Sequence, residues 1–174
     1  TSVNLANQTV AVKGTAQVDV RSDIALWAGR FTARDADLVK AYSKLESDLE
    51  KVLGFLGRSG IPREEIEVSA VTTMIQYRKT SQGYDTNEIE QYVLDQTVTV
   101  RSKEVDLVAS LSRESTTLIR EGVEFFSFSP EYYYSGIEDI KIQLLGEATK
   151  NARQRAEQLA VNSGGKVGPL RAGI

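Results

Sequence analysis

Histidine and cysteine are both absent from the 174 residues of this chain. Without histidine, the chain lacks the commonest general base near neutral pH and the commonest metal ligand, which excludes Ser-His-Asp catalysis and most zinc and iron sites. Without cysteine, it has no disulfide, no thiolate nucleophile and no zinc–thiolate cluster. Only carboxylate, lysine, tyrosine or serine–lysine chemistry remains. Because the sequence offers no convincing set of residues for these remaining chemistries, we predict no catalytic residue, no metal ligand and no cofactor.

An excess of positive charge and a long apolar run are also missing. The chain has 21 Lys and Arg against 24 Asp and Glu, a net charge of -3, so it has no broad positive field for nucleic acid. No window approaches the 18 or so apolar residues that span a bilayer, and no signal-like leader opens the chain. An apolar fraction of 41% is ordinary for globular proteins. Residues 1–174 are predicted to form a single domain.

Hydrophobic periodicity predicts the first half of the fold. Alternating apolar residues predict a strand over Val10 to Val20, and a polar turn of residues 21–23 leads into a second strand, Ile24 to Ala33, in a hairpin. Asp35 is expected to cap a long amphipathic helix that ends at Gly57 and Gly60. A third strand is predicted over Ile66 to Met74.

The second half repeats this order. Residues 78–90 lack apolar periodicity and are predicted to be an exposed connection. A fourth strand spans residues 92–100, Ser102 caps a helix that Gly122 closes, residues 123–128 form a fifth strand, and residues 137–160 form a last helix. The pattern predicts an α+β fold with a mainly antiparallel sheet of about five or six strands and three helices. Its core is βαββαβ, or ferredoxin-like, with an added N-terminal strand and a long C-terminal helix.

A few polar groups could in principle support chemistry. Ser163 and Lys166 have the spacing of a serine–lysine pair, but the two glycines between them favour a helix end. The same glycines follow a helix instead of a strand, which excludes a phosphate-binding loop. Asp85, Glu88 and Glu90 could hold a hard cation, yet they lack the spacing of a calcium loop. A solvated loop is the favoured interpretation for these three residues.

Three adjacent tyrosines, Tyr132, Tyr133 and Tyr134, form the most unusual local feature. On an extended segment they alternate between faces, so at least one of them faces away from the core. Tyrosine combines a large contact area with a hydrogen-bonding tip and is common at interfaces. The three residues are therefore candidate interface residues, with the edge of the core as the alternative. Trp27 is predicted to be a core residue.

Three stretches of the chain resemble the SIMPL domain family, a largely bacterial group of YggE-like periplasmic or envelope proteins. They are Val12 to Asp23, Leu56 to Ile66 and Ala148 to Gly168, and the last contains an Ala-x-x-x-Ala-x-x-x-Ala seam followed by Glu-x-Leu-Ala. The segment around the three tyrosines also looks like the family's lead into its terminal helix. None of these motifs is a catalytic signature.

The resemblance implies a periplasmic or cell-envelope location, with a signal peptide or lipid anchor removed and further strand residues after Ile174. It also implies a link to envelope or oxidative stress in some members, ring-like or channel-like oligomers in others, and adaptor roles in eukaryotic relatives. We expect a non-enzymatic, exported protein that forms a homo-oligomer. A module that binds an envelope protein partner is the first alternative, with residues 78–90 or the tyrosines as its recognition surface. A hydrolase that uses carboxylates or Ser163 with Lys166 is the second alternative.

Overall fold

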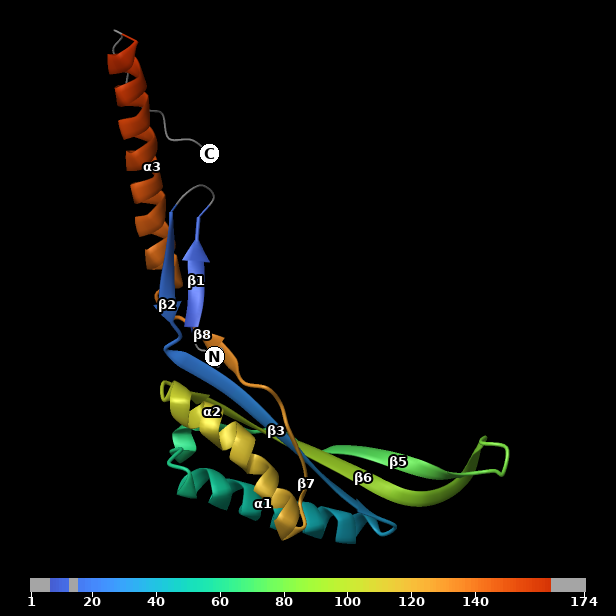
Figure 1. Ribbon diagram of the computed structural model, residues 1–174. Coiled ribbons are helices and arrows are strands. Elements are labelled where there is room, and N and C mark those ends of the chain that lie inside the picture. The colour runs from blue at the N-terminus through green and yellow to red at the C-terminus, as the bar shows by residue number, and fades with distance from the viewer. Residues whose placement is uncertain (1–6, 13–15, 164–174) are drawn as a thin grey trace. The chain divides into compact units, whose positions relative to one another are not determined.

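A six-stranded antiparallel sheet is the centre of the larger of two compact units, Asp23–Tyr133. The computed structural model describes residues 7–12 and 16–163. The strands of this sheet are β3 (Ile24–Asp35), β4 (Ile66–Val68), β5 (Thr72–Lys79), β6 (Asp85–Ser102), β7 (Glu124–Ser127) and β8 (Glu131–Tyr133). The long strands β3 and β6 pair at its centre, with β4 and β5 beside β6 and with β7 and β8 beside β3 (Figure 1).

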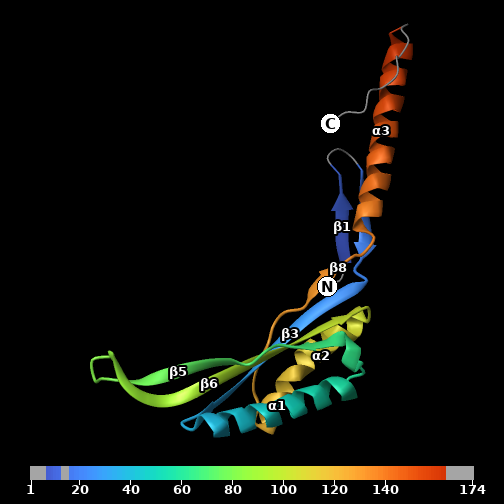
Figure 2. The same cartoon turned by 180° about the vertical axis from the view of Figure 1, so that it is seen from behind.

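Two α-helices cover one face of this sheet, and each is followed by a short 3-10 helix near it in the chain. The helices are α1 (Leu38–Arg58) and α2 (Val105–Glu114), and the 3-10 helices are η1 (Arg63–Glu65) and η2 (Ser115–Glu121). Figures 1 and 2 show α1 and α2 on the same side of the sheet. The odd-numbered residues of β3 from 25 to 33 include its buried side chains, whereas its even-numbered residues are partly or fully exposed. The burial of β3 therefore alternates between a covered and an open face, although its sequence is an apolar run without alternation.

The covered core is densest around Gly29 of β3. Trp27 is 1% exposed, and its indole Nε1 donates to Ser127 Oγ at 3.0 Å. The ring of Phe125 lies 6.1 Å from that of Trp27, between centroids. A Cβ atom on Gly29 would lie 2.3 Å from Phe125 Cζ, so the aromatic ring occupies the space of a side chain. The prediction that Trp27 is a core residue is confirmed.

Local signals set the helix ends, with corrections of one or two residues. Asp37, not Asp35, is the N-cap of α1, and its Oδ1 accepts from Val39 N at 2.9 Å, while Asp35 Oδ1 accepts from Asp37 N at 2.8 Å. Glu104 precedes α2 as its N-cap, and Ser102 Oγ accepts from Glu104 N instead of capping the helix itself. Gly122, with φ +86°, ends η2 in the left-handed conformation, as the sequence predicts.

The extents of two predicted strands and of one predicted connection are wrong. The predicted third strand is two strands, β4 and β5, interrupted at residues 69–71. The predicted connection of residues 78–90 is mostly strand, because β5 and β6 form a hairpin that turns at residues 80–84. The predicted first strand is also two strands, β1 (Asn7–Ala11) and β2 (Gln17–Arg21), which pair with each other. The strand β2 therefore pairs with β1 and not with β3 as a hairpin.

The smaller unit contains β1, β2 and α3 (Ile137–Asn162). Its core consists of Val10, Ala16 and Leu144, with partly buried apolar side chains around them. The α+β class, the six-stranded antiparallel sheet and the long C-terminal helix are confirmed. That residues 1–174 behave as one domain stays a prediction.

Candidate binding surfaces

Tyr132 and Tyr133 lie on opposite faces of the sheet, and Tyr134 belongs to the other unit. Tyr132 pairs with Ala25 of β3 and is partly buried on the covered side of the sheet. Tyr133 pairs with Ile24 on the open face and is 46% exposed. Tyr134 belongs to the smaller unit, where its ring lies against Gly136, 3.0 Å from the Cβ position that this glycine leaves empty. Their role as interface residues stays a prediction, and Tyr133 is the most exposed of the three.

A carboxylate holds the side chain of Tyr133. The Oη of Tyr133 donates a hydrogen bond to Oε2 of Glu131 at 2.5 Å. Glu131 lies two residues earlier, on the same strand and the same face. This hydrogen bond and the negative charge of Glu131 raise the pKa of the Tyr133 phenol above 10.0, its ordinary value. The phenol therefore stays neutral near pH 7 and holds the carboxylate against the sheet.

The hairpin of β5 and β6 extends past the rest of its unit. The pairing of β3 with β6 ends at Asp35 and Tyr92, so residues 76–91 form a two-stranded ribbon with no third strand among the described residues. We name residues 76–91 the arm. Figures 1 and 2 show it leaving the sheet as a curved ribbon beyond the helices. Both of its edges carry unpaired backbone groups, which are templates for pairing with another strand.

The arm and its base expose large apolar side chains. Tyr84 at the turn is 71% exposed and Met74 at the base is 55% exposed. Ile75, Tyr77 and Ile89 are also exposed large apolar side chains. A two-stranded ribbon without a buried face is marginally stable in water. This ribbon leaves little signal in the sequence, because one of its strands is mostly polar and the register of the pair shifts twice.

Opposite charges occupy the two strands of the arm. β5 carries Arg78 and Lys79, whereas the first part of β6 carries Asp85, Glu88 and Glu90. Lys79 Nζ lies 3.4 Å from Asp85 Oδ1 within the hairpin. Within residues 7–12 and 16–163, no three acidic side chains gather to hold a metal ion. Asp85, Glu88 and Glu90 lie on β6 instead of in the predicted solvated loop.

The open face of the sheet carries a second unusual group. The guanidinium carbon of Arg30 on β3 lies 5.5 Å from the ring centre of Phe126 and 5.7 Å from that of Phe128. The two rings meet edge to face, 4.9 Å between centroids. Phe126 is 53% exposed although it is a large apolar side chain. Such a cluster on an uncovered face is a candidate contact surface.

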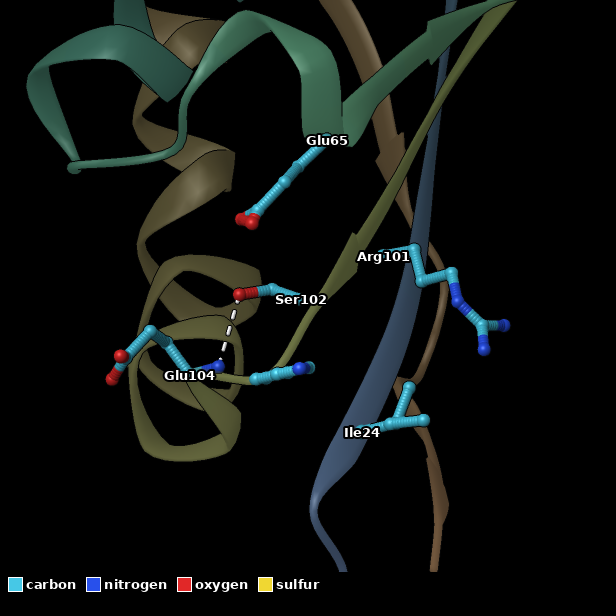
Figure 3. A pocket seen from close by; sticks show the side chains of 6 residues that line it. Ile24, Glu65, Arg101, Ser102 and Glu104 are labelled. Carbon is cyan, nitrogen blue, oxygen red and sulfur yellow. Dashed lines mark hydrogen bonds between the residues drawn. The ribbon is translucent and has the colours of Figure 1, made fainter. Parts of the chain in front are cut away.

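A hollow of about 440 Å³ lies at the end of β6 near the start of α2. It is lined by Ile24, Glu65, Arg101, Ser102, Lys103 and Glu104. Figure 3 shows Ser102 directed to the side of Glu65 and Glu104, while Arg101 is directed to the opposite side of the strand. Ser102 Oγ accepts from Glu104 N at 3.0 Å (Figure 3), so the hydroxyl stabilises the turn into α2. The role of Ser102 is therefore structural, because its hydroxyl is used in this turn.

Ser163, of the suggested serine–lysine pair, lies in the smaller unit. Ser163 Oγ donates to Leu159 O at 2.9 Å at the end of α3, and its suggested partner Lys166 lies outside the described residues. Arg153 Nε donates to Glu157 Oε1 at 3.0 Å, which is an ordinary ion pair on a solvated helix face. No described helix is long and apolar enough to cross a bilayer.

Comparisons with known proteins give one match that covers the chain. The family model described as "SIMPL: Protein of unknown function (DUF541)" matches residues 10–174. A search of curated proteins finds no match.

Solved structures give only remote similarity. One is a GlnK–ATP complex from B. subtilis, with 19% identity, a TM-score of 0.30, and coverage of 60% of this chain and 83% of that one. Another is a putative aminohydrolase from methicillin-resistant Staphylococcus aureus, with 14% identity, a TM-score of 0.33, and coverage of 75% and 36%. At these scores neither structure supports an argument about function.

Proposed function

Because the chain belongs to the SIMPL family, whose members are proteins of unknown function, we propose that it is a non-enzymatic, exported envelope protein that assembles with copies of itself through the arm. The arm is the observation that supports assembly most directly. It has two unpaired edges, exposed apolar side chains and no covering element among the described residues. The resemblance to envelope proteins supports export and a role in envelope or oxidative stress.

The charges of the arm favour one kind of pairing. If β5 of one copy lies beside β6 of the next in an antiparallel sheet, Arg78 and Lys79 meet the acidic strand of the neighbour. Pairing β6 with β6 would instead set Asp85, Glu88 and Glu90 against their own copies. The favoured contact is head-to-tail, because it joins two different edges. Head-to-tail contacts produce rings when the rotation closes.

A charge-swap series tests this assembly by light scattering and analytical ultracentrifugation of the full chain. Reversing the basic strand with Arg78→Glu and Lys79→Glu should lower the assembly constant at least tenfold, and so should reversing the acidic strand with Glu88→Lys and Glu90→Lys. Combining the four changes should restore assembly, because the opposite charges meet again. The controls for net charge are Lys40→Glu with Arg120→Glu for the basic reversal and Glu46→Lys with Glu50→Lys for the acidic one, all at exposed positions outside the arm.

Two results would contradict the proposal. A wild-type chain that stays monomeric at high concentration would rule out self-assembly. Assembly that neither reversal weakens would exclude the arm as the contact. Recovery of one stoichiometric foreign protein from an envelope extract, with a monomeric chain, would favour the adaptor alternative.

Export is tested separately by cell fractionation of the full-length gene product, where a cytoplasmic protein would refute it.

A further inference from the structure

A second hollow, of about 410 Å³, lies on the open face of the sheet in the larger unit. It is lined by Leu26, Ala28, Arg30, Thr97, Thr99, Phe128, Ser129 and Glu131. The register explains its position. Ala28 pairs with Thr99 on β6, and on the other side Phe128 N donates to Ala28 O at 3.0 Å before the chain leaves the ladder. The small side chain of Ala28 between Leu26 and Arg30 leaves the floor of the hollow open.

Glu131 in this lining accepts from Tyr133 Oη, whereas the side chains of Arg30, Thr97, Thr99 and Ser129 have no polar partner within the part of the chain that the structure describes. The guanidinium carbon of Arg30 lies within cation–π distance of two phenyl rings, and the side chain forms no ion pair or hydrogen bond with described residues. The hydroxyls of Thr97, Thr99 and Ser129 likewise form no hydrogen bond with described residues. Thr97 lies directly across the ladder from Arg30. One cation and three hydroxyls therefore line the same small space.

We propose that this hollow binds a small organic carboxylate with an apolar body. A guanidinium in cation–π contact still has N–H groups that can donate, and its planar fork matches a carboxylate. Leu26, Ala28 and Phe128 supply the apolar surface for the rest of the ligand. The volume falls within the range of about 300–1,000 Å³ that is common for small-molecule sites.

The charged side chains of the lining determine which class of anion fits the hollow and how the bound ligand is oriented. Glu131 pairs with Leu26, four residues from Arg30 along β3, or about 13 Å at ~3.3 Å per residue. One cation at one end and one carboxylate at the other favour a ligand with a single negative charge directed toward Arg30. A phosphate dianion or a nucleic acid strand would meet repulsion from Glu131 without a second cation in the lining.

The test uses cinnamate and octanoate as probes, with isothermal titration calorimetry and ligand-observed saturation-transfer NMR. Both methods work for any oligomeric state, so the result does not depend on assembly through the arm. We expect cinnamate to bind and its neutral isostere cinnamamide to bind at least tenfold more weakly. Arg30→Gln should weaken cinnamate at least tenfold, and Arg30→Lys should weaken it less. Ala28→Leu, which fills the floor, should abolish binding.

Arg101→Gln is the matched control, because Arg101 lies on the same face but lines the other hollow. It should change the affinity less than twofold. Far-ultraviolet circular dichroism and urea midpoints would verify that each variant is folded. The proposal is overturned if neither probe binds, if cinnamamide binds as well as cinnamate, or if Arg101→Gln weakens binding as much as Arg30→Gln.

Discussion

Replacing Gly29 by alanine should destabilise the larger unit because one aromatic ring already occupies the position of the new methyl group. An ideal Cβ at this position lies 2.3 Å from Phe125 Cζ, 3.0 Å from Phe125 Cε2 and 2.9 Å from Trp27 Cη2. Real Cβ contacts are essentially never shorter than 3.0 Å. Both rings are buried, so neither can move into solvent. Overpacking of this kind costs about 1–3 kcal/mol.

A double-mutant cycle separates the clash from other effects of the substitution. In a Phe125→Leu background the atoms Cζ and Cε2 are gone, and only the contact with Trp27 remains. The cost of Gly29→Ala should then fall by about 1 kcal/mol or more, which is within the range of coupling between residues in contact. Gly57→Ala is the matched control, because a Cβ there meets nothing within 4 Å. It should be neutral or stabilise α1 by up to about 1 kcal/mol.

Urea unfolding monitored by tryptophan fluorescence measures these changes. The chain has one tryptophan, and Trp27 is buried in the larger unit, so its emission reports unfolding of Asp23–Tyr133. The slope of the free energy of unfolding against urea should stay constant across the cycle. If Gly29→Ala costs the same in the wild-type and Phe125→Leu backgrounds, the ring does not set the cost, and the reasoning fails.

Three further predictions each concern a single residue. Asp37→Ala removes the side-chain acceptor for Val39 N and should lower the free energy of unfolding by about 1 kcal/mol, measured by urea titration. Gly122→Ala places a Cβ at φ +86° and should cost about 1–2 kcal/mol; an unchanged urea midpoint would contradict this. The raised pKa of Tyr133 means that its hydrogen bond to Glu131 contributes fully below pH 10 and is lost as pH rises through the folded pKa. Ultraviolet titration, with Tyr133→Phe to assign the signal, should show a lower pKa after Glu131→Gln.

Local patterns in the sequence were sufficient for most elements of the larger unit. The apolar run from Ile24 to Ala33 and the period of two in residues 92–100 predicted the central strands, and one face of each is buried under helices. The steps of three and four predicted α1, which also buries one face. The arm was missed because it buries no face, and a strand without a buried face leaves no alternation to detect.

The candidate surfaces were less predictable than the elements. The sequence predicted that Tyr132, Tyr133 and Tyr134 alternate between faces, but only the pairing of β8 with β3 shows that Tyr133 is on the open face, and Tyr134 belongs to the other unit. The sequence does not predict the cluster of Arg30 with Phe126 and Phe128, because Arg30 is about a hundred residues from the two rings in the chain. Only the pairing of β3 with β7 brings them together.

The absence of histidine and cysteine was decided by the sequence alone, and it removes whole classes of chemistry whatever the fold. The sequence likewise determined the family, the α+β class and the approximate helix ends, because these depend on residues close together in the chain or on a pattern along it. The tertiary structure alone decided which face of the sheet is open, where the arm leaves it, and that Ala28 lies beside an arginine without an ion pair among the described residues. Those features depend on strand order and register, which are set by contacts between residues far apart in the chain.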